Sequence, residues 1–132
     1  SNTSFILDSL KKLEYRGYDS CGILYKSKEI KVKKTVGDVT KLKEIVENES
    51  VKLALSHTRW ATHGAVSVLN SHPHVSEDEK VYLVHNGIIE NEVELKETYI
   101  PNVKLYGETD SEIIVNLIAY FSLDNSTLKS SF

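Results

Sequence analysis

Segments with helical spacing alternate with short apolar strands along this chain, and their order limits the folds that the chain can adopt. Ile6, Leu10 and Leu13, for example, recur at the spacing of a helix that ends before Gly17. The same reasoning predicts helices over residues 4–15, 38–48 and 90–98 and from Thr109 onward, strands over 21–25, at 30–32, over 51–56 and over 81–84, and a loop over 64–76. This mixed order favours an α+β fold, in which helices cover layers of β-sheet.

Length and charge exclude several classes of protein. The chain has 132 residues, which suffice for one domain but are few for a large core. A formal net charge of −3 argues against a nucleic-acid-binding protein, because there is no basic excess to neutralise phosphates. Lys31, Lys33 and Lys34 are expected on the solvated face of an edge strand. No apolar run approaches membrane-spanning length and no signal peptide is visible, so we expect a cytoplasmic protein that binds no membrane.

Three short polar strings, each at the end of an apolar run, contain most of the residues capable of chemistry. They are residues 57–64, 85–91 and 108–112. An arginine in the first string can hold a carboxylate, and an Asn-Gly turn in the second can present amide donors to an oxyanion. An aspartate in the third string can hold an ammonium group. Together the strings predict a pocket for an amino acid whose amide carbonyl is attacked.

Arg59 and Asp110 each have a simpler alternative interpretation. A lone arginine most often forms a surface ion pair, but Arg59 ends an apolar strand and precedes Trp60, which favours a binding role. Asp110 lies in the string Thr109 to Glu112, which matches a capping box, and an acidic residue in a first helical turn favours the macrodipole whatever it binds. A structural and a binding role are compatible for this aspartate.

Asn86 and Gly87 are candidates for an oxyanion site, where glycine permits a close approach that a Cβ would obstruct. The alternative is an ordinary hairpin turn. The following Ile88 and Ile89 do not continue as an alternating strand, which weakens that alternative.

Five histidines raise the question of a zinc site, especially His72 and His74 on either side of Pro73. No HExxH or CxxC spacing accompanies them, so we expect no metal. Hydrogen bonding within the fold is the expected role of His57, His72 and His85.

Taken together, the strings resemble one family closely, the glutaminase (class II amidotransferase) domain of glutamine–fructose-6-phosphate aminotransferase, also called glucosamine-6-phosphate synthase. The matching strings span roughly residues 10–118 and are Leu13 to Ser20, His57 to Gly64, Asn70 with His72 to Ser76, His85 to Asn91, and Glu108 to Asp110. The resemblance implies an N-terminal-nucleophile hydrolase fold, a four-layer αββα sandwich. Residues 1–132 would form part of this type 2 amidotransferase domain.

The resemblance also implies roles for individual residues. Arg59 would bind the glutamine α-carboxylate, Asp110 its α-amino group, and the Asn86 amide with the Gly87 N–H would form the oxyanion hole. The glutamine loop that closes over the substrate would include Trp60, Thr62 and His63, and Arg16 would lie near the nucleophile. Val66 stands where the family usually has proline, which leaves the stiffness of this loop open.

The family releases ammonia from L-glutamine without a cofactor and transfers it to fructose 6-phosphate. That transfer takes place in sugar isomerase domains of the same polypeptide, which are absent from this sequence. The full-length enzyme is expected to be a homo-oligomer. Two other hypotheses stay open: a catalytically inactive glutamine-binding module, and a related amidotransferase with another acceptor.

The family's nucleophile is a cysteine at the mature N-terminus, with its own α-amine as base. Ser1 to Ser4 align with the segment just after the family's first strand, so the nucleophile and the later strands beyond Phe132 are expected to be missing. The domain would then be incomplete at both ends and inactive by itself. Cys21 and Gly22 form the same Cys-Gly pair that begins the mature chain in the family, but Cys21 is expected to be a buried strand residue.

Overall fold

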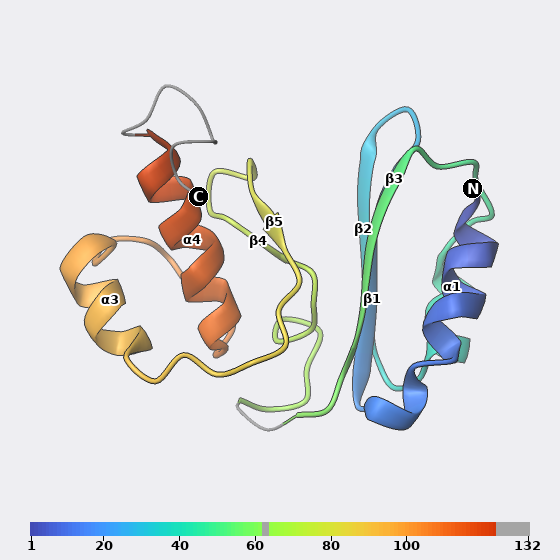
Figure 1. The fold of residues 1–132 in the computed structure, drawn as a ribbon, viewed down its shortest axis with the longest axis horizontal. Helices are drawn as coiled ribbons and strands as arrows, with labels where there is room; N and C mark the ends of the chain where they lie inside the picture. Colours follow the sequence, from blue (N-terminus) through green and yellow to red (C-terminus); the bar gives the residue numbers. More distant parts are fainter. Residues whose placement is uncertain (62–63, 124–132) are drawn as a thin grey trace. The chain divides into compact units, whose positions relative to one another are not determined.

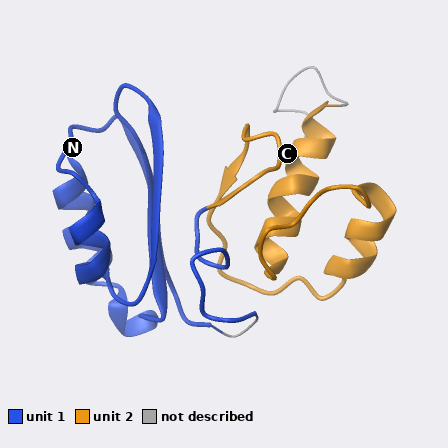
Figure 2. Cartoon of the chain, turned by 180° about the vertical axis from the view of Figure 1, so that it is seen from behind, with its two compact units in different colours: residues 1–73 blue, residues 74–132 orange. Residues whose placement is uncertain are grey.

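The computed structural model describes residues 1–61 and 64–123, so Thr62 and His63 lie outside the described residues. The chain divides into two compact units, Ser1–Pro73 and His74–Phe132, coloured separately in Figure 2. Each unit has its own small antiparallel sheet and its own helices.

The first unit is built on three antiparallel strands, β1 (Ser20–Lys26), β2 (Ile30–Val36) and β3 (Leu53–Arg59), in the order β2-β1-β3. The central strand β1 is buried along its length except at Lys26, because it has a neighbour on each side. The strands predicted over 21–25 and at 30–32 are confirmed and pair as an antiparallel hairpin, and the third predicted strand continues beyond Ser56 to Arg59. This extension brings a candidate binding residue into the sheet.

The edge position predicted for β2 is confirmed among the described residues, and Lys33 is exposed as expected, but Lys31 and Lys34 are less solvated than expected. Lys31 forms an ion pair with Glu49 at 2.9 Å. Lys34 donates a hydrogen bond of 2.7 Å to the carbonyl oxygen of Ser71. Lys31 and Lys34 therefore attach the edge strand to neighbouring segments.

Helices α1 (Thr3–Lys11) and α2 (Val39–Ile45) cover one face of this sheet, as Figure 1 shows. Alternate residues of β1 point toward them, as the pleat of a strand requires. The resulting core comprises Leu7, Leu10, Cys21, Ile23, Tyr25, Val39, Leu42 and Val51. Asn2 caps α1 by accepting from the N–H of Phe5, and Asp38 caps α2 in the same way.

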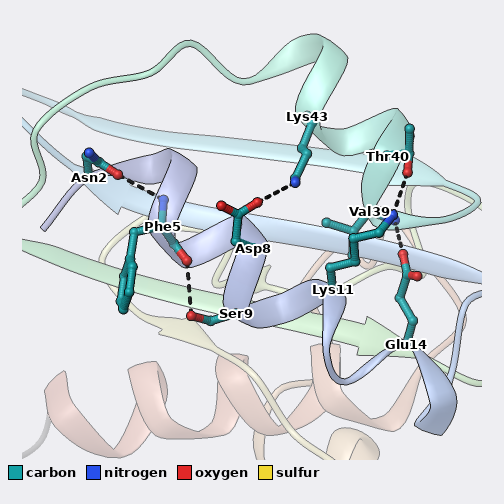
Figure 3. Close-up of polar contacts among 9 residues, drawn as sticks. All are labelled: Asn2, Phe5, Asp8, Ser9, Lys11, Glu14, Val39, Thr40 and Lys43. Atoms are coloured by element: carbon teal, nitrogen blue, oxygen red, sulfur yellow. Dashed lines mark hydrogen bonds and ion pairs between the residues drawn. The ribbon is translucent and has the colours of Figure 1, made fainter.

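The helix predicted over 4–15 is too long at its C-terminal end. Helix α1 ends at Lys11, and a separate 3-10 turn η1 covers Glu14–Arg16. The break has a physical reason, visible in Figure 3: the Glu14 carboxylate turns toward α2 and accepts a hydrogen bond of 2.8 Å from the N–H of Val39. Lys43 pairs with Asp8 of α1 in the same region.

The segment before Pro73 packs against the other face of β1. Gly22 permits this contact, because a Cβ at this position would lie 1.9 Å from the carbonyl oxygen of His72. The predicted loop over 64–76 is confirmed as mostly irregular, but only its first part, residues 64–69, is largely exposed to solvent. Its polar residues Asn70, Ser71 and His72 are buried.

The second unit contains a two-stranded ribbon, β4 (His74–Val75) with β5 (Tyr82–Leu83), and helices α3 (Glu92–Tyr99) and α4 (Asp110–Leu123). The predicted strand and helices are confirmed with somewhat different bounds. Among the described residues, no helix is long and apolar enough to cross a membrane.

The buried face of α4 does not follow the apolar residues of its sequence. Five apolar residues recur at helical spacing, Ile113, Ile114, Leu117, Ile118 and Phe121, but only Ile113 among them is buried, and Phe121 is 39 % exposed. The buried positions include the polar side chains Glu112 and Asn116, whose hydrogen bonds satisfy them. Both oxygens of Glu112 accept from backbone N–H groups, those of Tyr106 and Gly107, rather than serving the expected capping box.

Candidate functional site

The C-terminal end of β3 presents Arg59, whose side chain is buried and held by backbone carbonyl groups. Its guanidinium donates to the carbonyl oxygen of Ala65 at 2.9 Å and to that of Gly64 at 3.4 Å. The buried Asn70 donates to the same Ala65 oxygen at 2.8 Å. Gly64 has a φ of 79°, a left-handed conformation that glycine adopts without strain. The chain after β3 therefore bends back over the arginine and fixes its orientation.

Arg16 and Trp60 belong to the same end of the first unit. The backbone of Gly17 approaches that of β3 so closely that a Cβ would lie 2.6 Å from the nitrogen of Trp60. Asp19 joins the two segments further: its N–H donates to the carbonyl oxygen of Arg59 at 3.0 Å, and its carboxylate accepts from Ala61 at 2.9 Å. The turn that contains Arg16 is thus held against the strand that contains Arg59.

The side chains of Arg16 and Trp60, unlike that of Arg59, are exposed. Trp60 is 58 % exposed and meets Tyr18 edge-on, with ring centroids 6.1 Å apart. The guanidinium of Arg16 lies over the ring of Tyr15, and its Nε donates to the hydroxyl of that tyrosine at 3.0 Å. The linking function of Asp19 was missed from the sequence, because its partners are 40 or more positions away along the chain.

Asp110 and the Asn86–Gly87 pair are brought together in the second unit. Asp110 begins α4, is 6 % exposed, and accepts a hydrogen bond of 2.8 Å from the N–H of Ile89. The next residue of the helix, Ser111, is joined to Nδ1 of His85 by a hydrogen bond of 3.0 Å. The first turn of α4 therefore contacts the loop both before and after the predicted oxyanion pair.

Gly87 is needed for close packing, although the nearest atoms belong to this chain. A Cβ at this position would lie 2.8 Å from Nε2 of His85. This contact with His85 is a reason for glycine that is separate from the expected approach of an oxyanion. A second histidine contacts the residue before α4: Nε2 of the buried His74 lies 2.9 Å from the hydroxyl of Thr109.

Cys21 is confirmed as a buried strand residue. It is 1 % exposed, and its thiol donates to the carbonyl oxygen of Gly37 at 3.6 Å. Burial first, and the nearby acids Asp38 and Glu14 second, raise the pKa of the thiol to about 12. A thiol attacks as its thiolate, so Cys21, which is protonated and buried, is not suited to act as a nucleophile.

The four described histidines, His57, His72, His74 and His85, form hydrogen bonds or ring contacts within the fold. The expected hydrogen bond is confirmed for His85, whereas the rings of His57 and His72 stack with centroids 4.1 Å apart. No group of three potential metal-ligating side chains was found among residues 1–61 and 64–123.

Comparison with a solved structure defines the class of fold. The glutamine phosphoribosylpyrophosphate amidotransferase of B. subtilis, solved with ADP and GMP, superimposes with a TM-score of 0.73 over 97 % of this chain and 28 % of that chain, at 22 % identity. The likeness confirms the predicted fold class: the chain has part of the N-terminal-nucleophile hydrolase fold of the amidotransferases, and its sheets are antiparallel.

The chain belongs to the glutamine amidotransferase domain family, whose model matches residues 41–129. Its relatives named glutamine–fructose-6-phosphate aminotransferase (isomerizing) include that of Bacillus subtilis strain 168, 48 % identical over 118 residues, which are 88 % of this chain and 20 % of the relative. That of Staphylococcus epidermidis strain RP62A is 45 % identical over 130 residues, 96 % of this chain and 22 % of the relative. The enzyme of Chlamydia abortus is 47 % identical over 131 residues, with the same two shares. The chain spans about a fifth of the length of these curated relatives.

Proposed function

We propose that these residues belong to the glutaminase domain of a glutamine–fructose-6-phosphate aminotransferase, which releases ammonia from L-glutamine. The identity to the named relatives supports the activity. The observation that bears most directly on the chemistry is the attachment of the 85–89 loop to the start of α4. This attachment joins Asp110, a carboxylate suited to an ammonium group, to the loop that contains Asn86 and Gly87, which is suited to an oxyanion. Both lie in the second unit.

Arg59 is proposed to bind the α-carboxylate of glutamine. Its guanidinium is already oriented by the carbonyl oxygens of Gly64 and Ala65, so binding costs little side-chain entropy. Trp60 is exposed beside it and is proposed to be part of the loop that closes over the substrate. Thr62 and His63 are proposed to belong to the same loop, and Arg16 to lie near the nucleophile.

Asp110 is proposed to hold the α-amino group of glutamine. Its Oδ2 accepts from Ile89, and a carboxylate oxygen can accept more than one hydrogen bond. The side-chain amide of Asn86 and the N–H of Gly87 are proposed to donate to the oxygen that becomes negative during attack. Such donors contribute most when they are in place before the charge develops.

The attacking thiol is assigned to a cysteine outside these 132 residues, because the one cysteine within them is buried and neutral. Its sulfur forms a bond to the amide carbon, and collapse of the tetrahedral intermediate releases ammonia and leaves a thioester. Water then hydrolyses the thioester to glutamate and restores the thiol. Ammonia is proposed to pass to fructose 6-phosphate in sugar isomerase domains of the same polypeptide, in a cytoplasmic homo-oligomer.

Steady-state kinetics of the full-length enzyme with glutamine test these assignments. Arg59→Ala should raise the KM for glutamine, because a charge-assisted hydrogen bond contributes roughly 1.5–3 kcal/mol, about ten- to a hundredfold in affinity. Asp110→Asn should act similarly through the ammonium group. Asn86→Ala should instead lower kcat by roughly a hundredfold or more, since its donor matters most in the transition state.

Synthesis driven by free ammonia should survive all three changes and serves as the control for folding. If Asn86→Ala raised only KM while Arg59→Ala lowered only kcat, the assignment of roles would be wrong. Absence of ammonia release from the unsubstituted enzyme, with glutamine still bound, would instead identify a glutamine-binding module. Release without glucosamine 6-phosphate would indicate another acceptor.

A further inference from the structure

The loop that contains Asn86 and Gly87 is exposed at its tip and anchored at both ends. Asn86, Gly87 and Ile88 are exposed, and Ile88 is 71 % exposed, whereas the flanking His85 and Ile89 are half-buried. An exposed tip of this kind has few packing contacts of its own. Its conformation therefore depends on the two residues at its ends.

Both ends are fastened to the first turn of α4. Before the tip, His85 Nδ1 and the hydroxyl of Ser111 are 3.0 Å apart, and Ser111 is only 2 % exposed. After the tip, the N–H of Ile89 donates to Asp110 at 2.8 Å. The hydroxyl of Ser111 also donates a long hydrogen bond of 3.5 Å to Oδ1 of Asp110, which connects the two fastenings.

The ring of His85 also determines where Gly87 can lie. It is so close that a Cβ on Gly87 would be 2.8 Å from Nε2 and 3.2 Å from Cε1. The bond at Nδ1 to Ser111 fixes the rotation of this ring, and the ring in turn supports the glycine backbone. Movement of the ring would therefore displace the N–H that Gly87 offers.

We propose that Ser111 and His85 are positioning residues for glutamine hydrolysis, which hold the Asn86–Gly87 donors in the geometry that the oxyanion requires. The inference rests on the proposed function. Ser111 acts through His85 and touches no reacting atom. Preorganised donors cost no reorganisation when charge develops, so loosening them slows the chemical step and leaves glutamine binding through Arg59 unchanged.

The first test compares Ser111→Ala with Ser122→Ala in the full-length enzyme. Each variant loses one serine hydroxyl from α4, but the hydroxyl of Ser122 donates to the carbonyl oxygen of Ile118 at the far end of the helix. Ser111→Ala should lower kcat for glutamine by about tenfold, less than the loss of a direct donor. KM should change little, because the 3.5 Å hydrogen bond from Ser111 to Asp110 is too long to hold that carboxylate. Ser122→Ala should leave both constants unchanged.

A second readout separates positioning from general destabilisation. An aldehyde analogue of glutamine forms a tetrahedral adduct with the nucleophile, whereas L-glutamate occupies the site without one. Ser111→Ala should weaken inhibition by the aldehyde by about the same factor as kcat and leave inhibition by glutamate unchanged. Equal weakening of both inhibitors would overturn the proposal, because it would indicate a disrupted pocket.

Substitution of His85 keeps the proposal testable even if Ser111→Ala does not fold. His85→Asn places a polar atom near the former Nδ1 and should retain much more kcat than His85→Leu, which cannot bond Ser111. Equal activity of these two variants, or identical kinetics of Ser111→Ala and Ser122→Ala in an active enzyme, would refute the proposal. Lack of glutaminase activity in the unsubstituted enzyme would instead refute the proposed function.

Discussion

Replacing Gly22 by alanine adds one methyl group where β1 meets the segment before Pro73. The new Cβ would lie 1.9 Å from the carbonyl oxygen of His72 and 3.1 Å from Cγ of Lys34. Ordinary contact begins near 3.4 Å, so the His72 backbone must move by about 1.5 Å in an interior that is close-packed. The movement also strains the hydrogen bond between Lys34 and Ser71.

The free energy of unfolding should therefore fall by about 3 kcal/mol, the upper end of what an overpacked core costs. Urea unfolding of the purified protein, followed by circular dichroism, gives this value. Ser20→Ala is a matched control on the same face of β1. The hydroxyl of Ser20 is buried without a hydrogen-bond partner among the described residues, so its removal should cost nothing or stabilise the fold.

The reasoning fails if Gly22→Ala unfolds within about 0.5 kcal/mol of the unsubstituted protein, since such a change is typical of an unconstrained surface position. It also fails if Ser20→Ala is the more damaging of the two. That outcome would mean that the buried hydroxyl has an essential partner and that the segment before Pro73 yields easily.

Two further predictions concern the first unit. Cys21 should resist alkylation at pH 8 in the folded protein and react once urea unfolds it, because burial keeps the thiol neutral. Its raised pKa contributes stability that is complete below the ordinary value of 9.0 and is lost as the pH rises toward about 12. Unfolding measured across this range should show a steeper alkaline loss than in Cys21→Ala, and parallel curves would contradict the assignment. Glu14→Ala removes the carboxylate that caps Val39 and should cost about 1 kcal/mol in the same unfolding assay, whereas Glu44→Ala, at an exposed position of α2, should change little. A cost at Glu44 equal to that at Glu14 would show that the cap contributes nothing.

The strands of the first unit could be predicted from the sequence because their signals are local. Ile30 and Val32 alternate with lysines, and an apolar run precedes them across a short turn. The end of α1 could not be predicted in the same way. It depends on Glu14 reaching Val39, which is 25 positions further along the chain.

The buried face of α4 could not be predicted from apolar periodicity, for a related reason. Periodicity counts apolar residues as buried, whereas Glu112 and Asn116 are buried because backbone groups elsewhere in the unit satisfy them. The N–H of Glu77, which binds Asn116, is 39 positions away. Residue type alone contains no signal for such a partner.

The same distinction applies to the candidate site. The strings around Arg59, Asn86 and Asp110 could be proposed as binding groups from the sequence, because a guanidinium, an amide and a carboxylate are recognisable in any sequence. The contacts that hold these groups in place cannot be recognised in the sequence, because Ser111 is 26 positions from His85 and Asp110 is 21 positions from Ile89. Both contacts become visible only when the fold brings α4 to the loop.

Arg59 shows why binding and stability must be measured together at this site. Its guanidinium satisfies the carbonyl oxygens of Gly64 and Ala65, so Arg59→Ala removes hydrogen bonds of the fold as well as a proposed clamp for the carboxylate. Asn70 still donates to Ala65 after this substitution, which limits the structural loss. A rise in KM larger than the loss in unfolding free energy can explain would therefore support substrate binding. A rise that Asn70→Ala reproduces would be explained by the loop alone.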